Sequence, residues 1–537
     1  MPHKTPVQLF ALAALLLLCM AGMIWRCYSV AAGGQAVNAG VRQGKYHLSV
    51  PVSEGTIYDR NLNPMNHSEE TVLAVVSPTP DTIASIFSKL RDRDAVAGQL
   101  QRVSPFVCEL TEDAEETPNL KILHGRSAPE GSLPAQHLLG YRQNGTGMTG
   151  IERAYSGWLS ACDVTADITF TVSGRGEALP GAGSEIRFSG QQGGGVVTTL
   201  DLSVQRVTET ALQKAAPNAG AAVVMDCKTG EILACASTPV YDPGHLAEAM
   251  ENPQSPFINR ALSAYSVGSV FKLVTAAAAL EHGISDQLMY QCEGYTTVYG
   301  KTFHCHQWNG HGLLNMEDAL IASCNPYFIS LSQILTADAM HETASSLGFG
   351  KETGLAEGLI ASAGYLPSAE ELQIDAEKAN FSFGQGKLSA TPLQITTMTA
   401  CIANGGVYHA PRLMQGVTAD GITVRQFERA DGTQAISAET AETLRGMMRS
   451  VIYENEGTNA KPANTTAAGK TSTAQTGHFA EDGSEYCHAW MTGFFPAENP
   501  QYAVTVLVEN GGSGNQAAAP LFREIIESMT EMLSPAG

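Results

Sequence analysis

The sequence predicts an α+β fold for the larger, C-terminal part of the chain. Three observations predict it: short β-rich runs stand at both ends of this part, a helical middle separates them, and an amphipathic helix closes the chain. Each predicted strand is bounded by turn residues. The predicted strands are 221–226, 231–237, 468–475, 489–495 and 502–509, and the clearest helices are 270–280 and 521–533.

An apolar run near the N-terminus is the first element along the chain. Residues 9–25 carry no charge, and a helix of this length, at about 1.5 Å per residue, spans about 25 Å, close to the hydrocarbon thickness of a bilayer. The run predicts a single-pass anchor, with residues 1–30 as a short cytoplasmic tail and membrane helix. A cleaved signal peptide with a site at Ser29-Val30-Ala31 is the alternative. Either interpretation places the remaining residues outside the cytoplasm.

A mixed region follows and ends at Gly193-Gly194-Gly195. It has several Gly and Pro breaks, so we predict a smaller N-terminal domain, 31–195, before a larger domain, 196–537. In the larger domain, the first two predicted strands flank Cys227-Lys228-Thr229-Gly230 and form a β-hairpin. The Ala-rich helix 270–280 ends at His282-Gly283.

The composition narrows the function classes. The chain has 537 residues, with 32 Lys and Arg against 53 Asp and Glu, and a formal net charge of −21. The absence of a basic cluster argues against nucleic acid as a partner, because binding to phosphates requires one. The hydrophobic fraction of 44% and charged fraction of 16% are those of an ordinary globular chain.

The first motif with chemical meaning is Ser269-Val270-Phe271-Lys272, at the start of the 270–280 helix. A serine there is commonly a helix cap. Lys272, however, lies on the same helix face as Ser269 and beside an apolar helix that must be buried. A desolvated lysine loses its proton more readily, and its neutral amine can take the proton of Ser269. The motif therefore predicts a serine nucleophile for acyl transfer.

The second motif is Ser323-Cys324-Asn325, in a turn after a predicted helical stretch, 314–322. Ordinary turn polarity is the alternative interpretation. In the functional interpretation, the Ser323 hydroxyl relays a proton to the leaving amine. The Asn325 amide would then hold the acyl side chain and the Lys272 amine.

The third motif, Lys470-Thr471-Ser472-Thr473, opens a predicted strand. A lysine on an edge strand commonly prevents aggregation. Such an edge also offers backbone groups to an extended peptide substrate, whose carboxylate Lys470 and Thr471 would bind. The backbone N–H groups of Thr473 and Ser269 would form an oxyanion hole, with Ser472 lining the same strand. A literal Lys-Thr-Gly at 228–230 falls in the hairpin turn, before Ser269, so we exclude it from the site.

In this order, the three motifs resemble those of the penicillin-binding protein and serine β-lactamase superfamily. Ser323 lies 54 residues after Ser269, and Lys470 lies 201 residues after it, a longer second interval than in the compact β-lactamases. The resemblance is to class B penicillin-binding proteins, the monofunctional peptidoglycan D,D-transpeptidases. Further stretches that match this class are 55–61 (GTIYDRN), 137–141, 150–155, 199–201, 259–261, 384–386 and 391–394.

The resemblance implies a penicillin-binding transpeptidase fold, an antiparallel sheet flanked by helices, over 196–537. It implies a pedestal or dimerisation-type domain over 31–195 and a membrane anchor, with the catalytic domain extracytoplasmic. Ser269 would attack the penultimate D-Ala of a peptidoglycan stem peptide and release the terminal D-Ala, and an amine of a second stem would form the crosslink. β-Lactams would acylate Ser269. No metal or organic cofactor is implied, and a lipid II polymerase is the expected partner.

Two alternatives remain open: a hydrolase, either a D,D-carboxypeptidase or a β-lactamase, and a non-catalytic β-lactam sensor or scaffold. The sequence does not identify division, elongation or sporulation as the process served. Three residues depart from the family pattern: Glu54 stands in place of Arg, Val267 in place of Pro and Ser472 in place of Gly. Because glycine lets the strand approach a substrate closely, we predict that Ser472 crowds the pocket or alters the affinity for β-lactams.

Three of the eleven cysteines lie between or within the first two motifs, with several histidines beside them. An extracytoplasmic location permits disulfides, and Cys292–Cys305 or Cys305–Cys324 are the candidate pairs. A zinc site is a further alternative, but the segment lacks the C-x-x-C spacing typical of one. The third alternative is that these cysteines are unpaired thiols.

Overall fold

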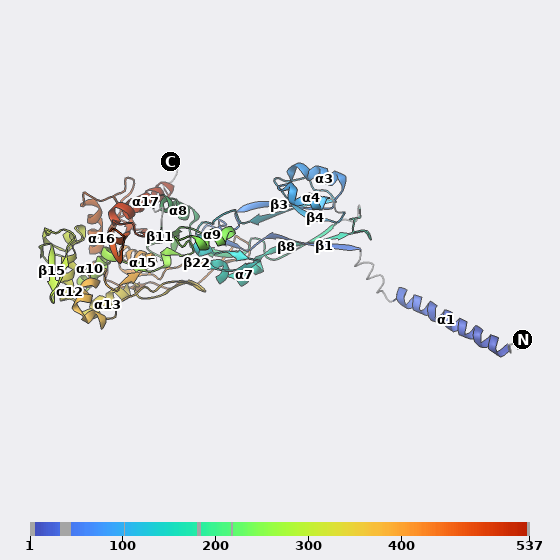
Figure 1. Ribbon diagram of the computed structural model, residues 1–537, viewed down its shortest axis with the longest axis horizontal. Coiled ribbons are helices and arrows are strands. Elements are labelled where there is room, and N and C mark those ends of the chain that lie inside the picture. Colours follow the sequence, from blue (N-terminus) through green and yellow to red (C-terminus); the bar gives the residue numbers. More distant parts are fainter. Residues whose placement is uncertain (1–5, 33–43, 101–102, 180–183, 216–218, 534–537) are drawn as a thin grey trace. The chain divides into compact units, whose positions relative to one another are not determined.

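The computed structural model describes residues 6–32, 44–100, 103–179, 184–215 and 219–533. The chain forms two compact units, and Figure 1 labels some of their elements. Unit 1 comprises Met1–Glu54, Glu69–Ser127 and Asp163–Gln191, and unit 2 comprises Gly55–Ser68, Ala128–Cys162 and Gln192–Gly537. The linear boundary predicted between residues 195 and 196 stays a prediction; in the structure, unit 2 also takes in two earlier segments.

Helix α1 (Pro6–Ala32) contains the apolar run found in the sequence. Its segment Phe10–Ser29 has a mean hydropathy of 2.0, and none of it is buried. By length and composition, this one helix in the described part of the chain could cross a membrane.

Unit 1 contains a six-stranded sheet with the strand order β4-β3-β5-β1-β8-β9. β1 and β5 are parallel, and the other neighbouring pairs are antiparallel. Burial alternates along β8, so one face of this strand packs on the core. The elements are β1 (Lys45–Ser53), β3 (Glu69–Val76), α3 (Pro80–Ile86), α4 (Arg93–Leu100), β4 (Phe106–Leu110), β5 (Leu120–Ser127), β8 (Val164–Thr171) and β9 (Ser184–Ser189).

Unit 2 is built on a five-stranded sheet with the order β12-β11-β27-β26-β25, and every neighbouring pair is antiparallel. Its strands are β11 (Gly220–Asp226), β12 (Ile232–Thr238), β25 (Ala468–Phe479), β26 (Glu485–Phe495) and β27 (Tyr502–Val508). The predicted antiparallel sheet and the hairpin around 227–230 are therefore confirmed. β25 forms one edge of this sheet.

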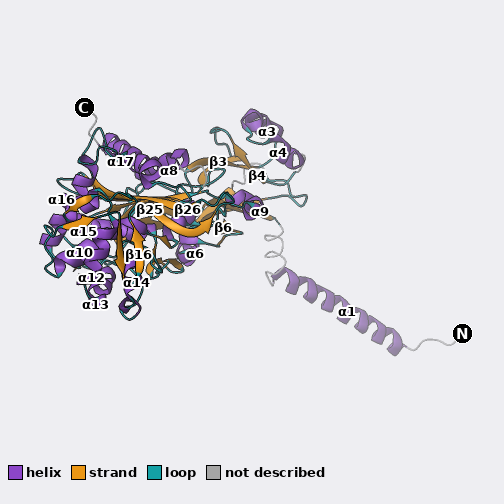
Figure 2. Cartoon of the chain, turned by 60° about the vertical axis from the view of Figure 1, so that its left-hand side comes forward, coloured by secondary structure: helices purple, strands orange, loops and turns teal. Residues whose placement is uncertain are grey.

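Helices cover both faces of the sheet of unit 2 (Figure 2). Along β11, Ala221 and Val223 belong to the hydrophobic core that contains α10 and α15, whereas Ala222 and Val224 belong to the core that contains α8 and α17. This alternation follows from the two-residue period of a strand. The flanking helices are α8 (Leu202–Ala215), α10 (Lys272–Glu281), α15 (Pro392–Ala403) and α17 (Ala519–Leu533), so the fold is α+β as predicted.

The remaining helices of unit 2 are α5 (Gln136–Leu139), α6 (Gly150–Ala154), α7 (Ser156–Cys162), α9 (Leu246–Glu251), α11 (Met316–Ile321), α12 (Asn325–Ile334), α13 (Ala337–Ser346), α14 (Asp375–Phe381) and α16 (Ala438–Tyr453). Its shorter strands are β2 (Thr56–Tyr58), β6 (Arg142–Gln143), β7 (Thr146–Gly147), β10 (Gly195–Thr198), β13 (Tyr265–Ser266), β14 (Tyr290–Cys292), β15 (Tyr295–Val298), β16 (Lys301–His304), β17 (Gly312–Leu314), β18 (Thr353–Ala356), β19 (Leu359–Ala361), β20 (Ser389–Ala390), β21 (Val407–Tyr408), β22 (Met414–Thr418), β23 (Val424–Gln426) and β24 (Thr433–Gln434).

Backbone pairing ties the first early segment of unit 2 to the later chain, and a buried ion pair within the second early segment binds a side chain of the first. Strand β2 pairs with β10 in a four-stranded sheet that continues through β22. Arg142 Nε lies 2.7 Å from Glu152 Oε2, and the Asn66 amide donates to the other oxygen of Glu152 at 2.7 Å. Both charged side chains are nearly fully buried. The stretches 55–61, 137–141 and 150–155 thus pack within unit 2.

Candidate active site

Ser269 lies in a 3-10 turn, Gly268–Phe271, that leads directly into α10. The α-helix therefore starts at Lys272, slightly later than predicted, because a 3-10 turn forms its first part. Gly268 has a φ of 65° and donates its N–H to the Gly384 carbonyl at 2.8 Å. A Cβ at Gly384 would lie 2.0 Å from the Gly268 carbonyl oxygen. Glycine at 384 is thus required for the close approach that supports the Ser269 turn.

Lys272 is fully buried, and its amine points to the second motif. Its Nζ lies 2.7 Å from the Ser323 carbonyl oxygen, 3.1 Å from Ser323 Oγ and 2.7 Å from Asn325 Oδ1. Burial lowers the pKa of Lys272 well below its ordinary value, and the positive charge of Lys470 lowers it further. The amine is thereby favoured in its neutral form, in which it can accept a proton.

Ser323 occupies the turn between α11 and α12 and has a φ of 53°. This left-handed conformation is costly for a serine. Asn315 caps α11 through a capping box, which is why the helix begins at Met316 and not at residue 314 as predicted. The turn brings Ser323 and Asn325 to the same lysine amine, as the sequence predicted.

Lys470 lies on the edge strand β25 and is also fully buried. Its Nζ donates to Ser323 Oγ at 3.2 Å and to the Thr471 carbonyl oxygen at 3.0 Å. Burial lowers the pKa of Lys470 to about 8. The three motifs, separated by up to 201 residues in the sequence, therefore meet at one serine hydroxyl.

The other residues of the third motif alternate along β25. Ser472 is buried, and its hydroxyl donates to the Val267 carbonyl at 2.9 Å. Thr471 is half-buried, whereas Thr473 is exposed and its hydroxyl accepts the Gly514 N–H at 3.2 Å. The Ser472 hydroxyl thus binds the backbone of Val267, the residue before Gly268. Val267 and Ser472 are two of the three residues that depart from the family pattern, and they contact each other.

A polar cleft of about 500 Å³ lies beside Asn325. It is lined by residues of β16, α14, the 383–386 turn and the distal part of β25. Asn380, Gln385 and Gln475 contribute amides to its wall, and Glu485 contributes a carboxylate. Sequence reasoning missed these residues. The only sequence signal for this wall of the cleft was the Gly384-Gln385-Gly386 stretch. It matched class B penicillin-binding proteins, but the match assigned no role to Gln385.

The cysteines near the site form no disulfide in the described part of the chain. The pairs Cys292–Cys305 and Cys305–Cys324, considered from the sequence, are therefore not bonded. The three thiols instead converge on His311.

A partly exposed serine three residues before a buried lysine, a second serine shared by two lysines and an edge strand beside a cleft define a serine acyl-transferring enzyme. The family model of the penicillin-binding protein transpeptidase domain matches residues 220–527. The chain is 32% identical over 492 residues to penicillin-binding protein PbpB of Mycolicibacterium smegmatis, covering 86% of this chain and 73% of PbpB. It is 27% identical to the peptidoglycan D,D-transpeptidase MrdA of Acinetobacter baumannii, covering 88% and 80%.

The fold is similar to a solved structure of penicillin-binding protein A from M. tuberculosis, a ceftriaxone acyl-enzyme complex. The TM-score is 0.64 and the identity 26%, over 76% of this chain and 93% of that one. The chain belongs to the penicillin-binding protein transpeptidase family, in its class B.

Proposed function

We propose that the chain is a membrane-anchored serine-type peptidoglycan D,D-transpeptidase. The observation that carries the proposal is the convergence of Lys272 and Lys470 on Ser323 Oγ, at 3.1 and 3.2 Å. Neither lysine has a carboxylate partner in the part of the chain that the structure describes, and two such lysines have no evident structural use in a core, because burying them is costly. Acyl transfer through Ser269 gives both lysines a role, Lys272 as the base and Lys470 as the positive charge for a carboxylate.

In the first half-reaction, neutral Lys272 takes the proton of the Ser269 hydroxyl as Oγ bonds to the carbonyl carbon of the penultimate D-Ala. The two carbonyl acceptors at 2.7 Å match the two N–H groups of a neutral amine. The peptide C–N bond then breaks, and the leaving D-Ala nitrogen receives a proton through the Ser323 hydroxyl. The product is an ester between Ser269 and the shortened stem peptide.

In the second half-reaction, an amine of another stem peptide attacks the ester carbonyl. The new amide crosslinks the two stems, and Ser269 regains its proton. In the first half-reaction, protonated Lys470, with Thr471 beside it, supplies the positive charge for the carboxylate of the terminal D-Ala. Thr473 and Ser472 belong to the strand along which the peptide lies, and the backbone N–H groups of Ser269 and Thr473 stabilise the oxyanion. A β-lactam acylates Ser269 as the stem does, consistent with the acyl-enzyme form of penicillin-binding protein A.

The location follows from α1 and the chemistry of the substrate. We assign α1 as a single-pass anchor, with residues 31–195 as the pedestal domain and 196–537 as the transpeptidase domain outside the cytoplasm, where peptidoglycan is crosslinked. A class B enzyme makes no glycan strand, so a membrane-bound polymerase of lipid II is the partner that supplies it. Co-purification with the anchored chain from detergent tests this assignment.

The experiment combines labelling with product analysis. Fluorescent penicillin is expected to label the full chain and to fail on Ser269→Ala and Lys470→Ala. Lys228→Ala is the matched control, because Lys228 is an exposed lysine in the other Lys-Thr sequence, in the β11–β12 turn. With lipid-linked pentapeptide strands, released D-Ala should accompany dimeric muropeptides. Release of D-Ala without dimers would instead indicate a carboxypeptidase, and absence of labelling in the wild type would contradict the catalytic assignment.

A further inference from the structure

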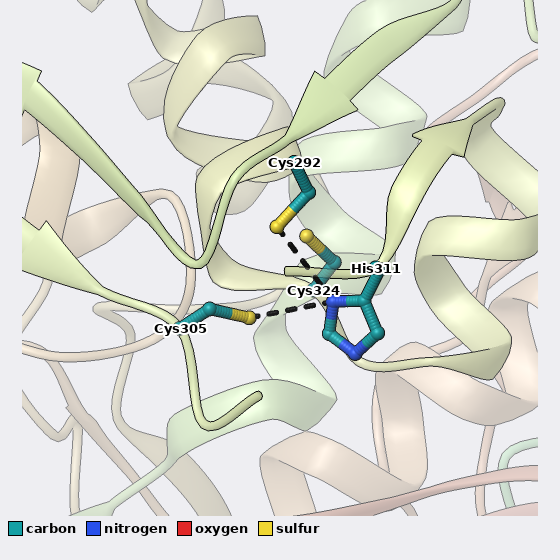
Figure 3. Close-up of side chains that lie close together, drawn as sticks. All are labelled: Cys292, Cys305, His311 and Cys324. Carbon is teal, nitrogen blue, oxygen red and sulfur yellow. Dashed lines mark hydrogen bonds between the residues drawn. The ribbon is translucent and has the colours of Figure 1, made fainter. Parts of the chain in front are cut away.

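Three thiols and an imidazole meet beside the second motif (Figure 3). The ligand atoms of Cys292, Cys305, His311 and Cys324 all lie within 4.8 Å of one another. The three cysteines are buried, and none is in a disulfide. They come from separate elements: Cys292 ends β14, Cys305 follows β16, His311 precedes β17 and Cys324 precedes α12.

Two separations from His311 match those of tetrahedral zinc. His311 Nδ1 lies 3.7 Å from Cys292 Sγ and 3.5 Å from Cys305 Sγ. With Zn–S bonds of about 2.3 Å and a Zn–N bond of about 2.0 Å, tetrahedral ligation places sulfur and nitrogen about 3.5 Å apart. In Figure 3, the three sulfurs and Nδ1 point toward a common centre.

The surrounding chain needs such a crosslink. Residues 290–314 form two separate two-stranded ribbons, β14–β17 and β15–β16, and a ribbon of this kind is marginal in isolation. Val298 and Phe303 of the β15–β16 hairpin contribute only to a small hydrophobic cluster. A metal that joins the ends of these ribbons adds to the limited stability that the side chains of the β15–β16 hairpin supply.

We propose that Cys292, Cys305, His311 and Cys324 bind a structural zinc ion that holds the Ser323-Cys324-Asn325 turn. Four protein ligands close the coordination sphere, so the ion serves structure and not as a site for an activated water. Cys324 lies between the two residues that contact Lys272. Binding of its sulfur therefore fixes the position of both contacts, and Cys305 fixes β16, which lines the cleft.

A disulfide would use the same atoms differently. It would join two of the three sulfurs and leave one thiol and His311 without a common function. Oxidation of the cluster would also displace the metal, because zinc binds the thiolates. The two states are separated by metal content and by the number of free thiols.

The test starts with the full chain, purified in detergent without chelator. Elemental analysis is expected to give one zinc per chain, and cobalt exchanged into the protein should show thiolate charge-transfer and tetrahedral visible bands. Cys305→Ser and His311→Ala are expected to weaken zinc binding by at least about tenfold. One matched control should keep the metal: Cys401→Ser, which changes a buried thiol in α15 outside the cluster.

Chelation of the wild-type protein gives a readout that does not depend on whether the variants fold. Removal of zinc is expected to lower the thermal unfolding midpoint and the rate of penicillin acylation, and added zinc should restore both. The proposal is overturned if the wild type carries no zinc and takes up no cobalt, or if Cys305→Ser retains full occupancy. Two fewer free thiols without reductant than with it would identify a disulfide instead. Zinc occupancy remains measurable even if the transpeptidase assignment fails.

Discussion

The pH dependence of acylation tests the roles of the two buried lysines. Lys272 must be neutral to accept the proton of Ser269, whereas Lys470 must be protonated to attract a carboxylate. Burial lowers both pKa values, that of Lys272 far below its ordinary value and that of Lys470 to about 8. A lowered pKa means that a lysine loses its charge at a lower pH, so acylation is expected to fall as the pH rises through about 8.

The size of the effect follows from titration of a single group. One pH unit above the pKa of Lys470, about one molecule in ten retains the protonated amine, so the rate constant should be about tenfold lower there. The measurement is the second-order rate constant for acylation by fluorescent penicillin from about pH 6 to 10, in a detergent solution of the full chain. Short reaction times keep hydrolysis of the free drug small.

Lys470→Arg supplies the decisive comparison. A guanidinium stays protonated throughout this range, so the alkaline decline should disappear even if the altered geometry lowers the rate at every pH. Lys228→Arg makes the same chemical change at an exposed turn and should leave the profile unchanged. If the rate of the Lys470→Arg variant still declines at the same alkaline pH, the assignment of this decline to Lys470 is refuted.

Three further substitutions test the supports of the site. Gly384→Ala places a Cβ 2.0 Å from the Gly268 carbonyl oxygen; we expect loss of most penicillin labelling, and normal labelling would contradict the close approach. Arg142→Met removes one partner of the buried Arg142–Glu152 ion pair and should lower the free energy of unfolding by about 3–5 kcal/mol, measured by urea titration; an unchanged midpoint would contradict this. Ser472→Gly loses a buried hydrogen bond and should cost about 1 kcal/mol of stability. The crowding predicted from the sequence also requires faster β-lactam acylation in this variant, and an unchanged or slower rate would exclude it.

Much of the fold was predictable because local signals and the global fold agree. The strands of the central sheet are short β-rich runs between turn residues, and α17 has the amphipathic pattern that one-sided packing on the sheet requires. The three motifs were visible because acyl transfer needs specific residue types at fixed local spacing. Boundaries were less accurate, as at α10, where a 3-10 turn precedes the helix.

The arrangement around the motifs could not be read from the sequence, since it depends on contacts between distant segments. Asn380 and Gln475 line the same cleft from α14 and β25, and neither has a local pattern that marks it. The four candidate metal ligands have the spacing C-x12-C-x5-H-x12-C, with no paired cysteines to indicate zinc. Only the two ribbons, which reverse the chain between Cys292 and His311, bring the ligands together.

The Ser323 turn connects the strain in the backbone to the chemistry of the site. A serine at a φ of 53° costs about 1–2 kcal/mol relative to an ordinary conformation, and such a conformation persists only where the surroundings hold it. Here the Lys272 amine binds the Ser323 carbonyl on one side, and the Cys324 side chain is held in the thiol cluster on the other. The strained conformation aims the Ser323 hydroxyl at both lysines. Lys272 both holds the turn and accepts the proton, so its removal would displace Ser323 and also remove the base. The two roles are therefore separated by variants that keep the Lys272 amine and loosen the turn. Substitutions of the cysteine ligands are such variants.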